Sequence, residues 1–219
     1  MHVDMVRDIG GLIHHFGKPS GAPPSVCTPA GESVTLTLDA AKREYHAALH
    51  SAGHAIDAAV AAVIGRGVLQ PLKGYHFEDS PYVEYHGKLP DGLEKEVLIK
   101  KMNEELENLV AADLETQVEV LDPACSSSIS SIYDFSSQLV CGSAEDDVRS
   151  GDMNNTEALG SGAVVGHGKH GMASRIVTIG GLACPCGGTH VQSTRQLKGT
   201  VVTKVKAKKG TLRVSYTLS

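Results

Sequence analysis

The spacing of apolar residues along the chain predicts two long helices. Residues 40–64 are rich in alanine and carry apolar residues at helical spacing, with Asp39 in the position of an N-cap and Gly65 just after the last turn. Residues 92–113 repeat the helical pattern, and we expect Asp91 to cap this second helix. Its apolar residues fall on one face: Leu98, Met102, Leu106 and Leu109.

Shorter segments alternate apolar and polar residues, which predicts β-strands. We expect strands at 32–38, 116–121 and 175–181, the last followed by a Cys-Pro-Cys-Gly-Gly loop. Two more strands should flank the turn at Asp79-Ser80-Pro81. Residues 200–218 predict a hairpin whose turn lies near 208–210.

The pattern also predicts how the chain is divided. Residues 123–173 are rich in serine and glycine and show little periodicity, so we interpret them as a long insertion. The fold class that we expect is α+β, with two long helices on an antiparallel sheet in a domain spanning 39–219. A small, partial β-barrel-like segment at 1–38 should precede it.

Composition narrows the function classes. The chain has 219 residues and a net charge of −5, which provides no overall attraction to nucleic acid, so an RNA contact needs a local basic patch. The C-terminal hairpin and the residues before it offer one. Its members are Lys198, Lys204, Lys206, Lys208, Lys209 and Arg213.

The sequence lacks a run of 18 apolar residues and a secretory apolar segment at its start, so we expect no membrane partner and a cytoplasmic location. Five cysteines, an odd number, indicate reduced thiols, some of them on a metal, rather than a set of disulfides.

The candidate chemistry lies in two short motifs. His50 and His54 stand at i and i+4 of the first predicted helix, so both imidazoles project from one face. Cys186 and His190 flank a Gly-Gly-Thr loop far along the chain. Together they supply the three or four nitrogen and sulfur ligands that zinc requires. We therefore predict a zinc site formed by these four residues.

Two rival ligands remain open at this stage. His46 extends the histidine stripe of the helix, and Cys184 lies two residues before Cys186. We expect both to contact the metal ligands rather than the metal. For Cys184 the reason is that Pro185 stiffens the chain between the two cysteines, so we do not expect both to bind one ion. The helix motif also lacks the glutamate that serves as general base in HExxH metalloproteases, which argues against peptide hydrolysis.

The motifs "HSAGHAIDAAV", "KGYHFEDSPYVEYHG" and "CPCGGTHV" together resemble the editing domain of alanyl-tRNA synthetases, and in particular the free-standing AlaX-type trans-editing proteins. This family is also described as the second additional domain of threonyl- and alanyl-tRNA synthetases. The resemblance covers roughly residues 30–120 and 174–218. It implies that His50, His54, Cys186 and His190 bind Zn²⁺, and that the partner is aminoacylated tRNA, by preference tRNA(Ala).

The resemblance implies a zinc-dependent aminoacyl-tRNA deacylase that removes serine, or also glycine, wrongly attached to tRNA(Ala). Gln70 is the expected partner of the serine hydroxyl, and Thr189 is a second expected specificity residue. Gly53 departs from the family, in which many members have threonine. Nothing matches the glycine-rich "FYPEGGGQ" segment of longer members, which is why we expect the N-terminal barrel to be partial. The class II aminoacylation motifs are absent as well, so we do not expect this chain to charge tRNA.

Two other functions stay open. One is a non-catalytic, zinc-stabilised tRNA-binding module, and the other is threonine-type editing of Ser-tRNA(Thr). The Gly-Gly pair between Cys186 and His190 argues against the second, because threonine-type relatives usually have Arg-Gly-Pro there. Whether the metal activates water or positions the substrate is also open, since four protein ligands favour positioning and three favour an activated water.

Overall fold

The computed structural model describes residues 2–18, 31, 33–121 and 174–219. The expected insertion at 123–173 lies outside these residues. The chain forms two compact units, Met1–Leu38 and Asp39–Ser219, and each is described by itself.

The smaller unit contains an antiparallel hairpin of β1 (His2–Ile9) and β2 (Leu12–Lys18). Gly10 and Gly11 form its turn with φ of 66° and 85°, values that glycine adopts without strain. The strand expected at 32–38 is wrong for its described residues, because 33–38 have no strand pairing. Val34, Leu36 and Leu38 are exposed, so the alternating pattern has neither a sheet nor a core to stabilise it.

The larger unit contains both predicted helices. Helix α1 (Ala40–Ile64) begins after Asp39, whose Oδ1 accepts a hydrogen bond from the Lys42 backbone N–H at 3.0 Å. It ends at Gly65, which has a φ of 110°. Both predicted boundaries of this helix are therefore confirmed.

Helix α2 (Lys95–Ala112) begins later than expected. The N-cap is Glu94 and not Asp91, because the backbone first makes a turn in which Leu93 N–H donates to the Pro90 carbonyl and Gly92 has a φ of 79°. The predicted apolar stripe is confirmed. Its four members are all buried: Leu98, Met102, Leu106 and Leu109.

The strands of the larger unit form two antiparallel sheets. One has the order β3-β4-β9-β8, formed by β3 (Gln70–Tyr75), β4 (Tyr82–His86), β8 (Thr200–Lys208) and β9 (Thr211–Leu218). The other has the order β5-β6-β7, formed by β5 (Gln117–Leu121), β6 (Ser174–Ile179) and β7 (Leu182–Pro185). Cys184 and Pro185 thus belong to an edge strand rather than to the expected loop, and proline is tolerated at an edge.

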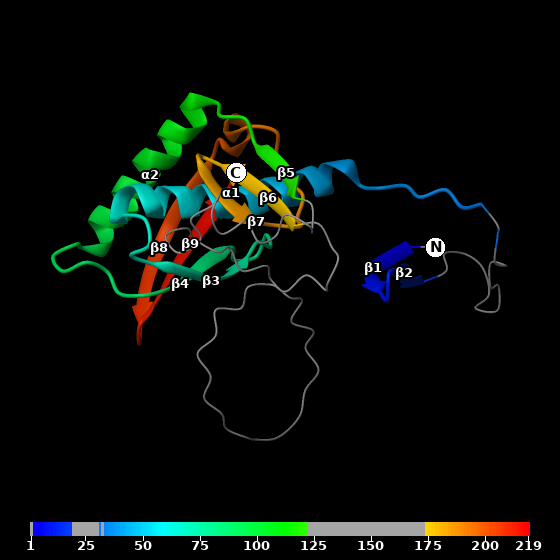
Figure 1. The fold of residues 1–219 in the computed structure, drawn as a ribbon, viewed down its shortest axis with the longest axis horizontal. Helices are drawn as coiled ribbons and strands as arrows, with labels where there is room; N and C mark the ends of the chain where they lie inside the picture. Colours follow the sequence, from blue (N-terminus) through cyan, green and yellow to red (C-terminus); the bar gives the residue numbers. More distant parts are fainter. Residues whose placement is uncertain (1, 19–30, 32, 122–173) are drawn as a thin grey trace, which may run out of the picture. The chain divides into compact units, whose positions relative to one another are not determined.

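Helix α1 packs against both sheets and against α2, and α2 covers β8 (Figure 1). Every residue of α1 from Ser51 to Val60 is buried. By length and composition α1 resembles a membrane-spanning helix, yet 72% of the apolar window lies inside the fold. Its apolar character therefore belongs to a helix whose middle, Ser51 to Val60, is buried in the core. The α+β class with antiparallel sheets is confirmed.

Candidate metal centre

The buried part of α1 presents two imidazoles toward the β6–β7 sheet. His50 and His54 lie one helical turn apart, with ring centroids separated by 4.9 Å. His54 is only 4% exposed. Its Nε2 is buried and has no hydrogen-bond partner, which is costly unless another group binds it.

The loop after β7 supplies the other half of the cluster. Arg175 of β6 holds this loop, since its Nη1 donates to the carbonyls of Cys186 at 2.6 Å and Gly188 at 2.9 Å. The backbone N–H of Cys186 in turn donates to the Arg175 carbonyl at 3.0 Å. A Cβ on Gly188 would overlap the His50 ring, so glycine is required for the loop to approach α1.

The four predicted residues converge in the structure. One nitrogen or sulfur atom from each of His50, His54, Cys186 and His190 lies within 4.8 Å of all the others. Cys186 Sγ is 3.5 Å from Nε2 of both His50 and His190. Ligand atoms on a tetrahedral zinc ion lie about 3.3–3.6 Å apart, given bonds of about 2.0 Å to nitrogen and 2.3 Å to sulfur. The donor set and the orphaned His54 nitrogen therefore fit a metal ion.

Burial also favours the neutral imidazoles that bind metals. Desolvation lowers the pKa of His50, and it lowers that of His54 further, with His50 and His190 adding to the effect. Desolvation and the neighbouring His50 lower the pKa of His190 to about 4. All three rings are thus uncharged at neutral pH, with a nitrogen lone pair free to act as ligand.

The two rival residues occupy different places. Cys184 is buried, and its Sγ lies 3.2 Å from Nδ1 of His54, so it contacts a candidate ligand from the side opposite the cluster. His46 is half-buried outside the cluster, where its Nε2 lies 4.0 Å from Glu78 and its ring meets the edge of Phe77.

The expected specificity residues are more scattered. Gln70 is exposed at the start of β3, four residues before Gly74 and hence about 13 Å along the strand from the end that faces the cluster. The side chain of Thr189 is exposed, and its backbone forms a hydrogen bond with the His50 ring. Gly53 lies inside α1, where glycine costs about 1 kcal/mol relative to alanine.

Sequence reasoning missed His76, the residue that follows β3. Its ring lies 5.1 Å from the His50 ring, and its Nδ1 is 2.7 Å from the hydroxyl of Tyr216. Burial, with His50 and His190 nearby, lowers the pKa of His76 to about 3. The flanking "KGYHF" carried the signal, because Gly74 precedes a histidine that the strand end directs toward α1.

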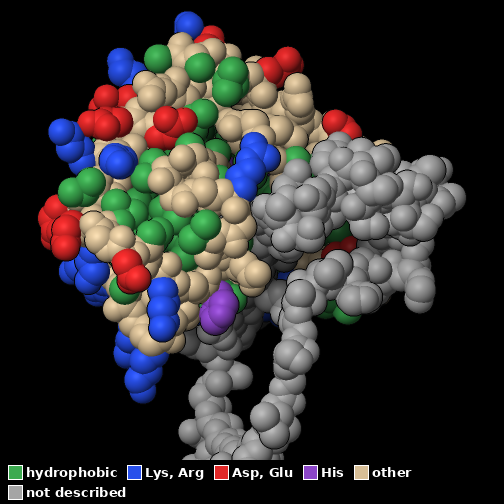
Figure 2. Space-filling view, turned by 60° about the vertical axis from the view of Figure 1, so that its left-hand side comes forward, with side chains coloured by type: hydrophobic (Ala, Val, Ile, Leu, Met, Phe, Trp, Pro, Cys, Tyr) green, Lys and Arg blue, Asp and Glu red, His purple; other side chains and the backbone are tan. Residues whose placement is uncertain are grey.

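The predicted basic residues share no single environment. Lys204, Lys206 and Lys208 lie exposed on the edge strand β8, opposite the buried Val205 face. Arg213 on β9 is already engaged, with a contact of 3.6 Å to Glu84 and a guanidinium 4.0 Å from the Tyr82 ring centroid. On the face shown in Figure 2, basic and acidic side chains are interspersed.

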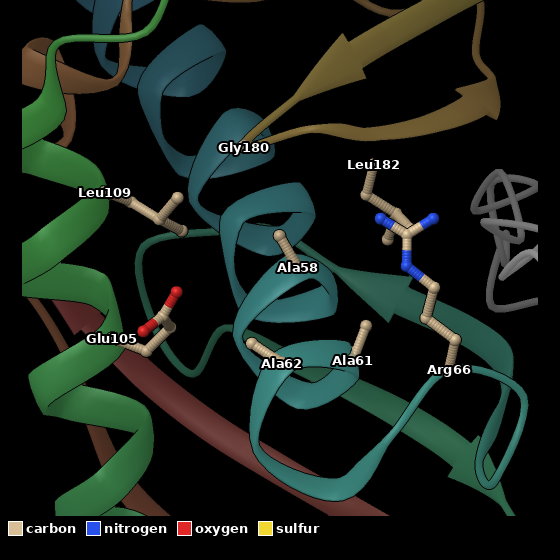
Figure 3. A pocket seen from close by; sticks show the side chains of 8 residues that line it. All are labelled: Ala58, Ala61, Ala62, Arg66, Glu105, Leu109, Gly180 and Leu182. Atoms are coloured by element: carbon tan, nitrogen blue, oxygen red, sulfur yellow. The ribbon is translucent and has the colours of Figure 1, made fainter.

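A shallow pocket of about 110 Å³ lies beyond the cluster along α1 (Figure 3). Alanines of α1, Glu105 and Leu109 of α2, Arg66, and the β6–β7 turn at Gly180 surround it. Ala58, the nearest of these to the cluster, is one helical turn past His54, so the pocket is separate from the candidate metal site.

Comparison with known proteins agrees with the motifs. Residues 174–214, which include Cys186 and His190, match the family model described as threonyl and alanyl tRNA synthetase second additional domain. Over 192 residues, 87% of this chain, the sequence is 29% identical to alanine–tRNA ligase 1 of Lachnoclostridium phytofermentans. The chain spans 17% of the length of that relative.

Proposed function

On the premise that this chain is related to the alanyl-tRNA synthetases, we propose that it is a trans-editing hydrolase. Its substrate is tRNA(Ala) that carries serine, or also glycine, and the bond cleaved is the ester to the terminal adenosine. The observation that carries the proposal is the convergence of His50, His54, Cys186 and His190 inside a chain with this relationship. An editing enzyme is needed because the amino-acid pocket of a synthetase discriminates only about 100-fold against a substrate that differs by an added hydroxyl, as serine differs from alanine.

The metal that we propose is Zn²⁺, because three imidazoles and a thiolate are its characteristic ligands. When bound, it supplies a Lewis acid that polarises an ester carbonyl or orients the substrate amino group. The protein provides the rest of the site. Arg175 fixes the ligand loop, and the buried surroundings of His54 exclude bulk water and strengthen polar contacts.

For the tRNA we propose the solvent-facing side of the four-stranded sheet. Residues that are direct partners across neighbouring strands lie on the same face of a sheet. One such row across β8, β9 and β4 contains Lys206, Arg213 and Glu84, and another contains Lys204, Ser215 and Tyr82. The lysines would contact phosphates, whereas Tyr82 is already stacked on Tyr75, with ring centroids 5.6 Å apart, and on the guanidinium of Arg213. We also propose that the β1–β2 hairpin corresponds to the partial barrel segment expected at 1–38. The proposed location of the protein is the cytoplasm.

The test is deacylation of Ser-tRNA(Ala) beside Ala-tRNA(Ala) by protein whose bound zinc has been quantified. We expect rapid loss of serine with alanine spared, abolition of activity by a chelator, and recovery when zinc is restored. The Cys186→Ala variant should lose both zinc and activity. Zinc-loaded protein that binds tRNA without turnover would overturn the hydrolase and leave a binding module, and a preference for Ser-tRNA(Thr) would reassign the substrate.

A further inference from the structure

The imidazole of His76 occupies space that two glycines leave open. A Cβ on Gly53 of α1 would overlap Cε1 of this ring and lie 2.8 Å from its Nδ1, and a Cβ on Gly74 of β3 would overlap its Nε2. Glycine in the middle of a buried helix is unfavourable, and glycine within a strand is unfavourable as well. Both costs are explained if an imidazole at this point is required for function.

The contacts of Tyr216 favour one of the two tautomers of His76. The Tyr216 hydroxyl donates to the Leu49 carbonyl at 2.9 Å, and a carbonyl oxygen accepts only. With the single hydroxyl hydrogen directed at Leu49, the tyrosine oxygen accepts from Nδ1–H of His76, 2.7 Å away, and this is the tautomer that we infer. A neutral imidazole with its hydrogen on Nδ1 is a hydrogen-bond acceptor at Nε2.

The ring also stands where it would meet the substrate. It lies 5.1 Å from the ring of His50, at the edge of the candidate metal cluster, and the residue is partly exposed. The hydroxyl oxygen of serine is three bonds from the carbonyl carbon of the same residue and lies about 3 Å from it in space. An ester held at the cluster therefore brings its side chain within reach of the His76 ring.

We propose that His76 is the specificity-determining residue of this site, accepting at Nε2 a hydrogen bond from the serine hydroxyl that alanine lacks. This inference rests on the proposed function. It replaces Gln70, at the distant end of β3, in the role of serine partner. Tyr216 is a positioning residue, because it acts on the substrate only through His76.

The test compares the kcat/KM ratio for Ser-tRNA(Ala) over Ala-tRNA(Ala) in the wild-type protein, His76→Phe, Gly53→Ala and Tyr216→Phe, with zinc content measured in each. We expect His76→Phe to lower the ratio by about 10- to 100-fold through loss of one hydrogen bond, with zinc retained. Gly53→Ala should lower it too, because the new methyl displaces the ring. His86→Asn, at an exposed histidine on β4, is the matched control and should leave the ratio unchanged.

Two further measurements separate this inference from the proposed function. ¹⁵N NMR should show His76 protonated at Nδ1 in the wild-type protein and a mixture of tautomers in Tyr216→Phe. A non-hydrolysable amide of serine and 3′-aminoadenosine should bind more tightly than its alanine counterpart, and His76→Phe should abolish this difference. Wild-type protein that binds this analogue selectively yet hydrolyses no charged tRNA would overturn the hydrolase only. Hydrolysis with a ratio unaffected by His76→Phe would overturn the role of His76 only.

Discussion

The thiol of Cys184 determines the direction in which the His54 ring points. With Sγ at 3.2 Å from Nδ1, the ring keeps its other nitrogen, Nε2, buried and without a hydrogen-bond partner. Metal-binding histidines usually have such a partner on the distal nitrogen, because it fixes the ring orientation and the tautomer. Cys184 therefore contacts a candidate ligand and lies outside the group of four that could hold a metal ion.

Removing this partner should weaken metal binding without abolishing it. We expect Cys184→Ala to lower zinc affinity about 10- to 100-fold, and Cys184→Ser, whose oxygen still accepts from Nδ1–H, to lower it less. Competition with a chromogenic chelator measures both affinities. Equal losses in the two variants would contradict the hydrogen-bond role and indicate a packing effect.

A second buried polar residue of α1 makes stability depend on pH. Asp57 is 2% exposed, and desolvation raises the pKa of its carboxyl to about 7 although Tyr85 donates a hydrogen bond to it at 2.6 Å. The unfolded chain releases this proton near pH 4 and the folded chain releases it near pH 7. Within this window the folded state binds more protons, so the contribution of Asp57 to stability falls as pH rises.

Asp57→Asn should remove this dependence, because the amide has a similar shape and does not titrate. We expect the free energy of unfolding of the wild-type protein, relative to the variant, to fall by up to about 1.4 kcal/mol per pH unit from pH 4 to pH 7, and then to level off. Urea unfolding with a chelator present measures it free of metal effects. Parallel pH profiles for the two proteins would contradict the assignment.

At the scale of elements, helix α2 packs against the core through one narrow stripe of apolar side chains. Leu98 and Met102 are 0% exposed and belong to the same core cluster as α1, whereas the neighbouring Val97 is 45% exposed. The free energy that attaches α2 to the sheet therefore comes from a few side chains on one face.

Two truncations on this helix should differ sharply. Leu98→Ala should lower the free energy of unfolding by about 2–5 kcal/mol through lost burial and a cavity, and Val97→Ala should change it by about 0.5 kcal/mol or less. Chemical denaturation of the two variants side by side measures both. Similar costs at the two positions would show that the helix packs on a different face.

The same helix shows what a sequence pattern predicts well. The i, i+3 and i+4 spacing determined the buried stripe of α2, and the i, i+4 pair of histidines in α1 correctly implied that both face one site, because both follow from local geometry alone. The interpretation misplaced the cap at Asp91, although the local sequence Pro90-Asp91-Gly92 is typical of a turn. It also misplaced the strand expected at 32–38, because a strand needs partner strands and the described residues 33–38 have none. His76 was missed because its role depends on space left by Gly53, a residue distant in sequence.

In the larger unit as a whole, the two sheets bring together residues that are far apart along the chain. Helix α1 contacts β4 and β9 of one sheet and β6 and β7 of the other, so the candidate metal cluster lies where the helix meets the second sheet. The first sheet leaves its lysine-bearing face exposed. Under the proposed function, catalysis and RNA contact would therefore use different surfaces of one unit.

Charge reversal on the exposed face should separate these two tasks. We expect Lys204→Glu combined with Lys206→Glu to weaken tRNA binding and to reduce the slope of log K against log salt by about one per lost phosphate contact. Zinc content should stay at the wild-type level. Filter binding over a range of salt concentrations measures the slope, and an unchanged slope would assign the RNA to another surface.

The pairing of β5 with β6 brings together the two ends between which the chain could be shortened or extended. Leu121 and Ser174 are direct partners in that ladder, so the described residues on either side of 122–173 end about 5 Å apart. The entropy of closing the ends of a connecting segment grows only slowly with the length of that segment. The junction is therefore a natural graft point, at which a short turn, a reporter domain or an affinity tag can be exchanged while the framework around it keeps its register.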